Sequence, residues 1–195
     1  MGHGSVTATQ ISCLGLVLLT LALAGCGSVA HNGAPSAAQL AADFKGSPAP
    51  LASLHAKANR LLGGGVRAFE AQLRALRGYP VLVNKWGSWC PPCRQEFPIL
   101  QQVSAALGRR VAFIGVDVHE PDASAGAAWL RRFPLSYPSF ADRSGAVNEA
   151  LGAASVPDTP VTYFYDGAGN QIFFHFGPYL SAASLEHDLR IYLGA

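Results

Sequence analysis

Residues 86–93 read Trp-Gly-Ser-Trp-Cys-Pro-Pro-Cys, and they lie between a predicted strand and a predicted helix. Two residues separate Cys90 from Cys93, so one helical turn brings the second sulfur back to the first. Cys90 then lies at the helix N-terminus, where unpaired N–H groups and the helix dipole favour a thiolate, the species that attacks disulfides. The spacing predicts a redox-active disulfide, with Cys90 as the nucleophile and Cys93 as the residue that resolves the mixed disulfide.

The apolar pattern on both sides of this motif predicts an α/β domain. Continuous apolar stretches at 81–86 and 111–118 are typical of buried strands. The other expected elements are helices at 91–107, 122–133 and 145–151, a short strand at 137–140, a hairpin of strands 161–165 and 172–176, and a last helix capped by Ser181. Parallel strands would therefore be followed by an antiparallel pair.

Residues 51–77 are expected to form a helical extension in front of this domain. Two helical pieces, 51–62 and 66–76, are separated by three glycines at 63–65. In the second piece apolar residues recur at helical spacing, so one face should pack on the domain.

The first part of the chain predicts export. No Asp, Glu, Lys or Arg precedes Asp43, and Ile11 to Ala24 is an apolar run. A bilayer-spanning helix needs about 20 apolar residues, so this run suits a signal peptide better than a membrane anchor. The n-region carries His3 but no Lys or Arg, where a positive charge is expected. We expect residues 1–25 to be a signal peptide, and the alternative is a buried N-terminal helix.

Residues 23–26, Leu-Ala-Gly-Cys, resemble the lipobox of bacterial lipoproteins. The resemblance implies cleavage before Cys26 and attachment of lipid to its thiol. Residues 27–50 are rich in Ala, Ser, Gly and Pro, which predicts a flexible tether. We therefore expect a lipidated tether at 26–50, a folded domain at 51–195, and a lipoprotein anchored to a bacterial membrane outside the cytoplasm.

Composition and cysteine count narrow the possible functions. The chain is 50% hydrophobic and 13% charged, with a net charge of +2, which favours a globular domain and argues against a nucleic-acid partner. Of its four cysteines, Cys13 lies in the expected signal peptide and Cys26 in the lipobox. Only Cys90 and Cys93 remain, and a single close pair is not a disulfide framework.

The stretch 83–98, with its Trp-Cys-Pro-Pro-Cys core followed by Arg94, Glu96 and Pro98, resembles the TlpA/ResA family of thioredoxin-like thiol–disulfide oxidoreductases. The resemblance extends over about residues 78–193 and includes the family's next strand at 111–118, its central insertion at 122–151 and its Pro-Thr-Thr-Phe motif at 160–163. It implies a thioredoxin-like fold with a central mixed sheet flanked by helices and the TlpA-type insertion. The helical segment at 51–77 would replace the β-hairpin that many relatives carry.

The resemblance also implies that Pro160 is a cis-proline facing the disulfide. Thr159 would then offer backbone groups to a substrate peptide, and the proline ring would keep metal ions from the sulfurs. Pro157 competes for this role, but the strand begins directly after Pro160.

Two positions depart from related proteins. Thioredoxin has a buried Asp behind the cysteines as a proton relay, and the aligned residue here is Asn84, which cannot titrate. Glu96, one turn beyond Cys93, is either the base that replaces it or an exposed helix carboxylate. Lys85 occupies a usually apolar strand position, and it either ends in solvent with its stem packed or tunes the thiolate.

The residues between the cysteines bear on the direction of electron flow. Pro91 and Pro92 lack two N–H groups that could stabilise the Cys90 thiolate, and strongly oxidising relatives have a His in this pair, so we expect a reducing site. With Trp89, both prolines would also contact substrate. The resemblance implies protein thiol or disulfide substrates, such as apocytochrome c, and a membrane thiol carrier of the CcdA/DsbD type as electron donor. No cofactor is expected, and the protein is expected to be a monomer.

Other functions fit the sequence less well. Half of a zinc site lacks a second ligand pair, and a peroxiredoxin would need a peroxidatic Cys near Thr and Arg. A Sco-type copper-delivery protein needs three residues between its cysteines and a His ligand, for which His175 is the candidate. The remaining alternative is a non-catalytic lipoprotein that binds partners through Trp86, Trp89 and Tyr163.

Overall fold

The structure is a computed structural model, and it describes residues 1–2, 39, 42–152 and 159–195. The helices and strands given below lie in the unit formed by residues 31–195. Cys26, and all but the first two residues of the predicted signal peptide, lie outside the described residues, so export and lipid attachment stay predictions. Within the described residues, no helix is long and apolar enough to cross a bilayer.

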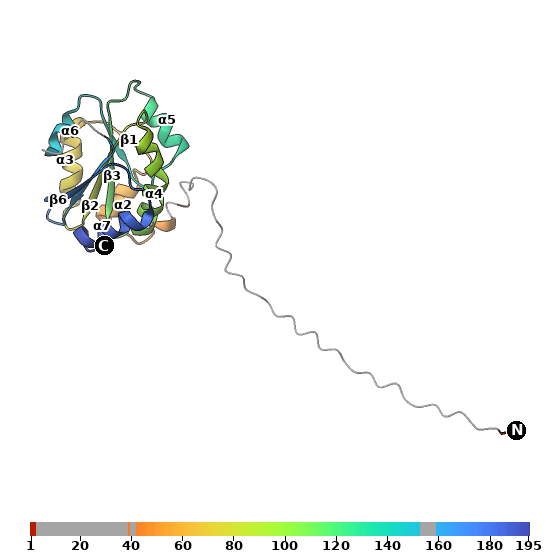
Figure 1. The fold of residues 1–195 in the computed structure, drawn as a ribbon. Coiled ribbons are helices and arrows are strands. Elements are labelled where there is room, and N and C mark those ends of the chain that lie inside the picture. Colours follow the sequence, from red (N-terminus) through yellow and green to blue (C-terminus); the bar gives the residue numbers. More distant parts are fainter. Residues whose placement is uncertain (3–38, 40–41, 153–158) are drawn as a thin grey trace. The chain divides into compact units, whose positions relative to one another are not determined.

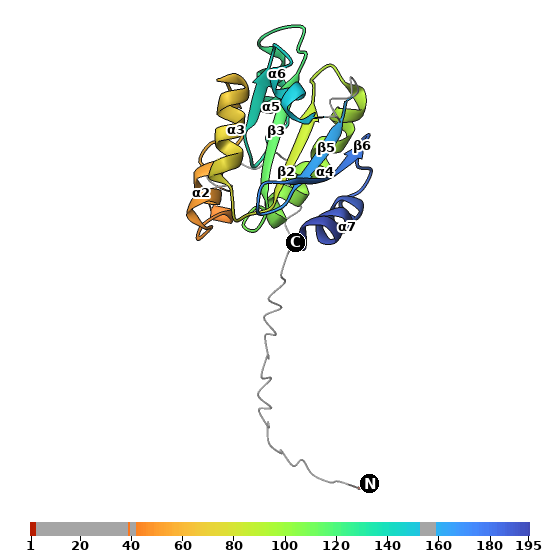
Figure 2. The ribbon, with the colours of Figure 1, turned by 90° about the vertical axis from the view of Figure 1, so that its left-hand side faces the viewer.

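A mixed sheet with strand order β1-β4-β3-β2-β5-β6 forms the centre of the fold (Figures 1 and 2). Its strands are β1 (Leu61–Leu62), β2 (Val81–Trp86), β3 (Ala112–Val118), β4 (Ser139–Asp142), β5 (Val161–Tyr165) and β6 (Gln171–Phe176). Strands β1, β4, β3 and β2 are parallel to one another. Strand β5 runs antiparallel to β2, and β6 runs antiparallel to β5. The expected parallel core with a terminal antiparallel pair is confirmed.

Helices cover both faces of this sheet (Figure 1). They are α2 (Ala49–His55), α3 (Gly65–Ala75), α4 (Pro91–Leu107), α5 (Ala125–Arg132), α6 (Ala146–Ala150) and α7 (Ala182–Leu193). Because successive strand residues point to opposite faces, the sheet has two hydrophobic cores. Val81 and Val83 pack with α3 and α6, whereas Leu82 and Trp86 pack with α4, α5 and α7.

The register of β2 and β3 determines where the motif at 86–93 lies. The two strands pair from Val81 opposite Ala112 to Trp86 opposite Asp117. Both strands therefore end at the same edge of the sheet, and α4 begins just after the end of β2. Loops after parallel strands meet at this edge, which is the usual place for a functional site in an α/β sheet.

The N-terminal extension is only partly helical, so the prediction of a helix over 51–62 is wrong in its second half. Helix α2 ends at His55, and the short strand β1 pairs in parallel with β4. Asn59 has a positive φ of 57°, and its backbone N–H donates to Tyr137 O at 3.1 Å. Without β1, the backbone groups at this edge of β4 would be unpaired, and β1 satisfies them. The apolar pattern of the extension does not reveal this pairing.

The packed domain also begins before the predicted boundary at residue 51. Phe44 is 5% exposed and stacks on the His55 ring with centroids 3.6 Å apart. Part of the segment predicted as tether therefore packs on the domain.

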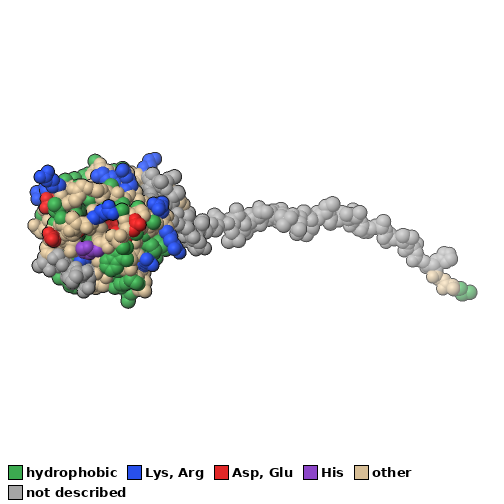
Figure 3. All heavy atoms as spheres, turned by 90° about the horizontal axis from the view of Figure 1, so that it is seen from above, with side chains coloured by type: hydrophobic (Ala, Val, Ile, Leu, Met, Phe, Trp, Pro, Cys, Tyr) green, Lys and Arg blue, Asp and Glu red, His purple; other side chains and the backbone are tan. Residues whose placement is uncertain are grey.

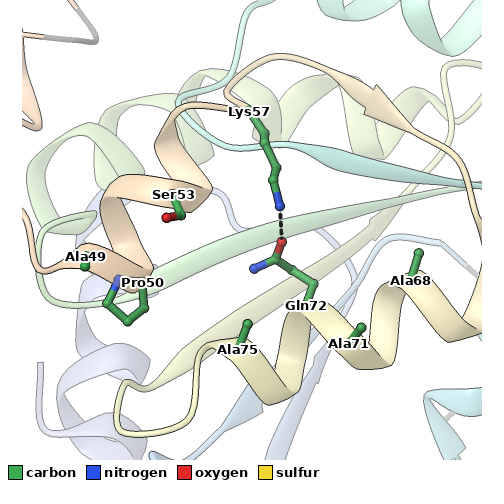
Figure 4. Close-up of a pocket in the computed structure, with 8 residues that line it drawn as sticks. All are labelled: Ala49, Pro50, Ser53, Lys57, Ala68, Ala71, Gln72 and Ala75. Atoms are coloured by element: carbon green, nitrogen blue, oxygen red, sulfur yellow. Dashed lines mark hydrogen bonds between the residues drawn. The ribbon is translucent and has the colours of Figure 1, made fainter.

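A hollow of about 580 Å³ lies between α2 and α3, where Lys57 Nζ donates to Gln72 Oε1 at 2.8 Å (Figure 4). Its other lining residues are small or apolar: Ala49, Pro50, Ser53, Ala68, Ala71 and Ala75. None of these residues is among those expected at the redox site.

Candidate redox site

The candidate site is built at the N-terminus of α4. Cys90 is the N-cap, and Pro91 and Pro92 occupy the first two helical positions, where a missing N–H costs no helical hydrogen bond. Cys90 and Cys93 form a disulfide with Cα atoms 5.3 Å apart. Cys90 is 2% exposed and Cys93 0%, so a sulfur from another molecule reaches Cys90 first.

The Thr159–Pro160 peptide bond, which precedes β5, is cis. The Thr159 carbonyl oxygen lies 3.6 Å from Cys90 Sγ. The Gly177 N–H donates to Pro160 O at 3.0 Å and so joins the start of β5 to the end of β6. The competing Pro157 lies outside the described residues. Thr159, the residue before Pro160, therefore lies next to the sulfur that is the expected nucleophile.

Glu96 lies one turn further along α4 than Cys93. It is 0% exposed, so the alternative of an exposed helix carboxylate is wrong. Asn84 Nδ2 donates to Glu96 Oε1 at 2.8 Å, and the Tyr179 N–H donates to Oε2 at 3.2 Å. Burial raises the pKa of Glu96 from 4.5 to about 8, and the two hydrogen bonds oppose this shift. Glu96 can therefore gain or lose a proton near neutral pH.

The two strand residues that depart from related proteins point to opposite faces. Asn84 faces α4, where its Nδ2 also lies 3.3 Å from Thr162 Oγ1 and its Oδ1 has no hydrogen-bond partner. Lys85 is 1% exposed, and its Nζ donates to Asn148 Oδ1 of α6 at 3.1 Å. The expectation that Lys85 ends in solvent is wrong, because α6 covers this face of the sheet.

The loop before Cys90 is held by residues that the sequence prediction missed. Ser88 N and Oγ donate to the two carboxyl oxygens of Glu120 at 2.5 and 2.7 Å. Arg94 Nε donates to Ser88 O at 2.6 Å. Glu120 follows β3 in the chain, and β3 and β2 end at the same edge, so adjacent parallel strands could have suggested this contact.

Of the three aromatic residues proposed as a recognition surface, only Trp89 is exposed. Trp89 has an exposed fraction of 42%, and its Nε1 donates to Val118 O at 3.1 Å. Trp86 and Tyr163 are fully buried, and Trp86 Nε1 donates to Ser139 Oγ of β4. The surface of three aromatic residues is therefore wrong, because strand alternation turns two of them into the cores.

His175, the candidate copper ligand, contacts the last helix. Its Nδ1 lies 3.7 Å from Asp188 Oδ2, and its ring stacks on Tyr179. Among the described residues, no group of three or more His, Cys, Asp and Glu side chains could hold a metal ion.

Figure 3 shows the molecule from above, turned by 90° about the horizontal axis from the view of Figure 1. In its described part, basic side chains are spread around the face between hydrophobic ones, and they do not form one patch. Charge alone therefore does not mark a binding site on this face.

Several known proteins are similar in sequence to the part of the chain that contains Cys90 and Cys93. The AhpC/TSA family model matches residues 46–170. The chain is 36% identical over 97 residues to a thiol:disulfide interchange protein DsbE homolog of Paracoccus denitrificans (strain Pd 1222), and the match covers 50% of each protein. It is 31% identical over 105 residues to the thiol-disulfide oxidoreductase ResA of Geobacillus kaustophilus (strain HTA426), over 53% of this chain and 58% of ResA. The chain thus spans about half the length of the curated relatives it matches.

A solved structure is similar over the same region. It is that of a secreted Mycobacterium tuberculosis disulfide oxidoreductase homologous to E. coli DsbE, with a TM-score of 0.51 and 28% identity. The similarity covers 60% of this chain and 84% of the other. The expected thioredoxin-like fold is confirmed, and so is the resemblance to ResA.

Proposed function

Since the chain belongs to the AhpC/TSA family, we propose that it is a thiol–disulfide oxidoreductase that acts on proteins through Cys90 and Cys93. One observation carries the proposal. The Cys90–Cys93 disulfide lies at the N-terminus of α4, with Cys90 Sγ 3.6 Å from the carbonyl oxygen that precedes the cis-proline. The names of the curated relatives, an interchange protein and an oxidoreductase, support the same activity.

In the reduced protein, the Cys90 thiolate attacks one sulfur of a substrate disulfide. The substrate S–S bond breaks, a Cys90–substrate bond forms, and the leaving sulfur takes up a proton. Cys93 then loses its proton and attacks Cys90 Sγ, which breaks the mixed disulfide and forms the Cys90–Cys93 bond present in the structure. The two cysteines supply two electrons, the two substrate sulfurs take up two protons from the solvent, and the substrate leaves as a dithiol.

Glu96 would move the proton of Cys93 in both directions. With a pKa of about 8, it carries a proton in the oxidised protein at neutral pH. When a dithiol reduces the protein, Glu96 gives this proton to the departing Cys93 sulfur. When Cys93 attacks the mixed disulfide, Glu96 takes the proton back. A pKa close to the working pH suits both steps.

The direction of electron flow is proposed to be reducing, with a membrane dithiol carrier as electron donor. The absence of N–H groups at Pro91 and Pro92 supports this direction, because the Cys90 thiolate then receives fewer hydrogen bonds. Apocytochrome c is proposed as one class of substrate, on the resemblance of residues 83–98 to the TlpA/ResA family.

The protein is proposed to work outside the cytoplasm, held on the membrane by lipid on Cys26. The support is the apolar run before Cys26 together with the secreted M. tuberculosis neighbour. Residues 1–25 would be the signal peptide, and the residues from Cys26 to the start of packing at Phe44 would form the tether.

Exposed apolar side chains favour a polypeptide as substrate. Trp89 is 42% exposed beside Cys90, and Phe176 is 49% exposed at the end of β6. Phe176 pairs with Val161, directly after the cis-proline. Apolar surface of this kind is typical of a site that binds protein.

The test is reduction of insulin disulfides with dithiothreitol as electron source. Wild-type protein should accelerate insulin precipitation, and Cys90→Ser should reduce the rate to that of dithiothreitol alone. Cys93→Ser is the matched control, because it keeps the nucleophile and should accumulate a mixed disulfide with insulin. Equal rates for wild type and Cys90→Ser would refute the proposal.

A further inference from the structure

Asp117 is a buried carboxyl group that the exchange reaction described above does not use. It lies on β3, opposite Trp86 of β2 and Ala141 of β4, and it is 3% exposed. Its Oδ1 atom is buried and has no hydrogen-bond partner. A charged carboxylate in such surroundings is costly, so the group needs either a proton or a compensating contact.

The packing around Asp117 leaves room for one polar neighbour. On the side of α5, a Cβ atom at position 126 would overlap Asp117 Oδ2, so Gly126 makes space for the carboxyl. On the other side, the strand register places Asp117 opposite Trp86, two residues before Ser88, and the Glu120 carboxyl that binds Ser88 lies within hydrogen-bonding reach of Asp117. Two carboxyl groups can share a hydrogen bond only if one of them carries a proton.

The surroundings assign that proton to Asp117. Burial, as the largest effect, and the hydrogen bond and charge of Glu120 together raise its pKa from 3.8 to about 9. The neighbours of Asp117 on the adjacent strands and on α5 do not titrate in this range; they are Trp86, Ala141 and Gly126. In the described part of the chain, Glu120 is the ionisable group that acts on Asp117. At neutral pH Asp117 therefore donates to Glu120.

Glu120 in turn binds the loop that leads to the nucleophile. Its two carboxyl oxygens accept from Ser88 N at 2.5 Å and from Ser88 Oγ at 2.7 Å. Ser88 lies two residues before Cys90, and the Cys90 N–H closes the same turn by donating to Gly87 O at 3.1 Å. The Glu120 carboxyl thus holds the side chain and the N–H of Ser88 in this loop, while Arg94 holds the Ser88 carbonyl.

We propose that Asp117 is a positioning residue, whose buried carboxyl holds Glu120 in the orientation that binds both donors of Ser88 and thereby fixes the loop that presents Cys90. The effect on rate rests on the proposed exchange function, whereas the hydrogen bonds themselves do not.

The test compares Asp117→Asn, which keeps a donor for Glu120, with Asp117→Ala, which removes it. The first readout is the proton chemical shift of the Ser88 amide in oxidised, ¹⁵N-labelled protein. The hydrogen bond to the Glu120 carboxylate should move this resonance downfield in the wild type and in Asp117→Asn, and the displacement should be lost in Asp117→Ala. Above pH 9 the wild type should lose it too, because Asp117 then gives up its proton, whereas Asp117→Asn should keep it.

The second readout is insulin reduction at pH 7. Asp117→Asn should remain within about twofold of the wild type, and Asp117→Ala should be about tenfold slower, because a small displacement of a reacting group is costly. A Ser88 amide unchanged in Asp117→Ala, or equally shifted in both variants, would overturn the inference. If Asp117→Ala fails to fold, a wild-type Ser88 amide that does not move between pH 7 and pH 10 overturns it. A wild type with the predicted amide behaviour but no insulin reduction refutes the exchange function instead.

Discussion

Glu96 of α4 and Asp117 of β3 are both buried carboxyl groups, but their surroundings differ. Glu96 accepts hydrogen bonds from Asn84 Nδ2 and the Tyr179 N–H, and these contacts oppose the effect of burial. Asp117 has one oxygen without a partner, and its ionisable neighbour is a second carboxyl, which adds to the effect of burial. The pKa of Glu96 is about 8 and that of Asp117 about 9.

The difference shows that a raised pKa does not by itself identify a proton-transfer group. Donors aimed at Glu96 stabilise its charged form, so this group can cycle between two states near neutral pH. Asp117 has no such donors and a negative neighbour, so it keeps its proton and serves as a fixed donor. The contacts, rather than the direction of the shift, separate a reacting group from a positioning one.

Replacement of Glu96 by Gln should have the largest effect, because it removes the proton donor for Cys93 but keeps the shape of the side chain. The rate at which dithiothreitol thiolate reduces the disulfide should fall about 100-fold at pH 7, a typical loss for a general acid. The wild-type rate per thiolate should also fall as the pH rises through about 8, where Glu96 loses its proton. Stopped-flow tryptophan fluorescence measures both. A pH profile of Glu96→Gln identical to the wild-type profile would assign the proton to another group.

The pH dependence of folding stability should report the ionisation of both carboxyl groups. Each binds its proton more tightly in the folded than in the unfolded chain, so stability is greatest below the unfolded pKa values of 4.5 and 3.8 and is lost as the pH rises to about 8 and 9. Each group should contribute a fall of up to about 1.4 kcal/mol per pH unit. Urea unfolding of the oxidised protein at several pH values measures the slope, and Glu96→Gln and Asp117→Asn should each remove their own part. A flat profile for the wild type would contradict both pKa shifts.

The two groups also differ in how far sequence could predict them. Glu96 could be singled out because it lies one helical turn beyond Cys93, and helical spacing is a strong local signal. Its burial could not be predicted, because Tyr179 and the β6–α7 connection reach it only in the folded protein. Asp117 was read as part of an apolar strand, and its contacts come from Gly126 and Glu120, which only the path of the chain after β3 brings together.

The same distinction applies to the fold. Helix α4, strand β2 and the hairpin of β5 and β6 follow from local patterns and turn residues, and their predicted bounds agree closely with the structure. Strand β1 was missed because its pairing with β4 is not encoded in its own sequence. Lys85 was expected in solvent because nothing local indicates that Asn148 of α6 lies over it. Long-range packing accounts for each of these errors.

Replacement of Asn84 by Asp should convert the Glu96 arrangement into one like that of Asp117. The variant exchanges an amide donor for a second carboxyl at 2.8 Å from Glu96, and two such groups share one proton. The pH at which reduction by dithiothreitol thiolate declines should rise by about one unit or more, equivalent to about 1.4 kcal/mol. Asn84→Ala is the control, since it removes the donor without adding charge and should give a smaller rise. A decline at the wild-type pH in Asn84→Asp would mean that the Asn84 contact does not set the proton affinity of Glu96.

The smallest effect is expected from Ser88→Ala, which removes the hydroxyl donor to Glu120 at 2.7 Å and leaves the backbone N–H in place. The loss of one such hydrogen bond should cost about 1 kcal/mol and lower the melting temperature of the oxidised protein by about 2–4 °C. The Ser88→Ala variant is most informative in double variants with Asp117→Ala or Glu96→Gln. Ser88 and Asp117 both act on Glu120, so the stability effects of Ser88→Ala and Asp117→Ala should not add. Ser88 and Glu96 have no common partner, so the effects of Ser88→Ala and Glu96→Gln should add. Thermal unfolding of the single and double variants gives both couplings, and additive effects for Ser88 and Asp117 would mean that the two residues do not act through one carboxyl group.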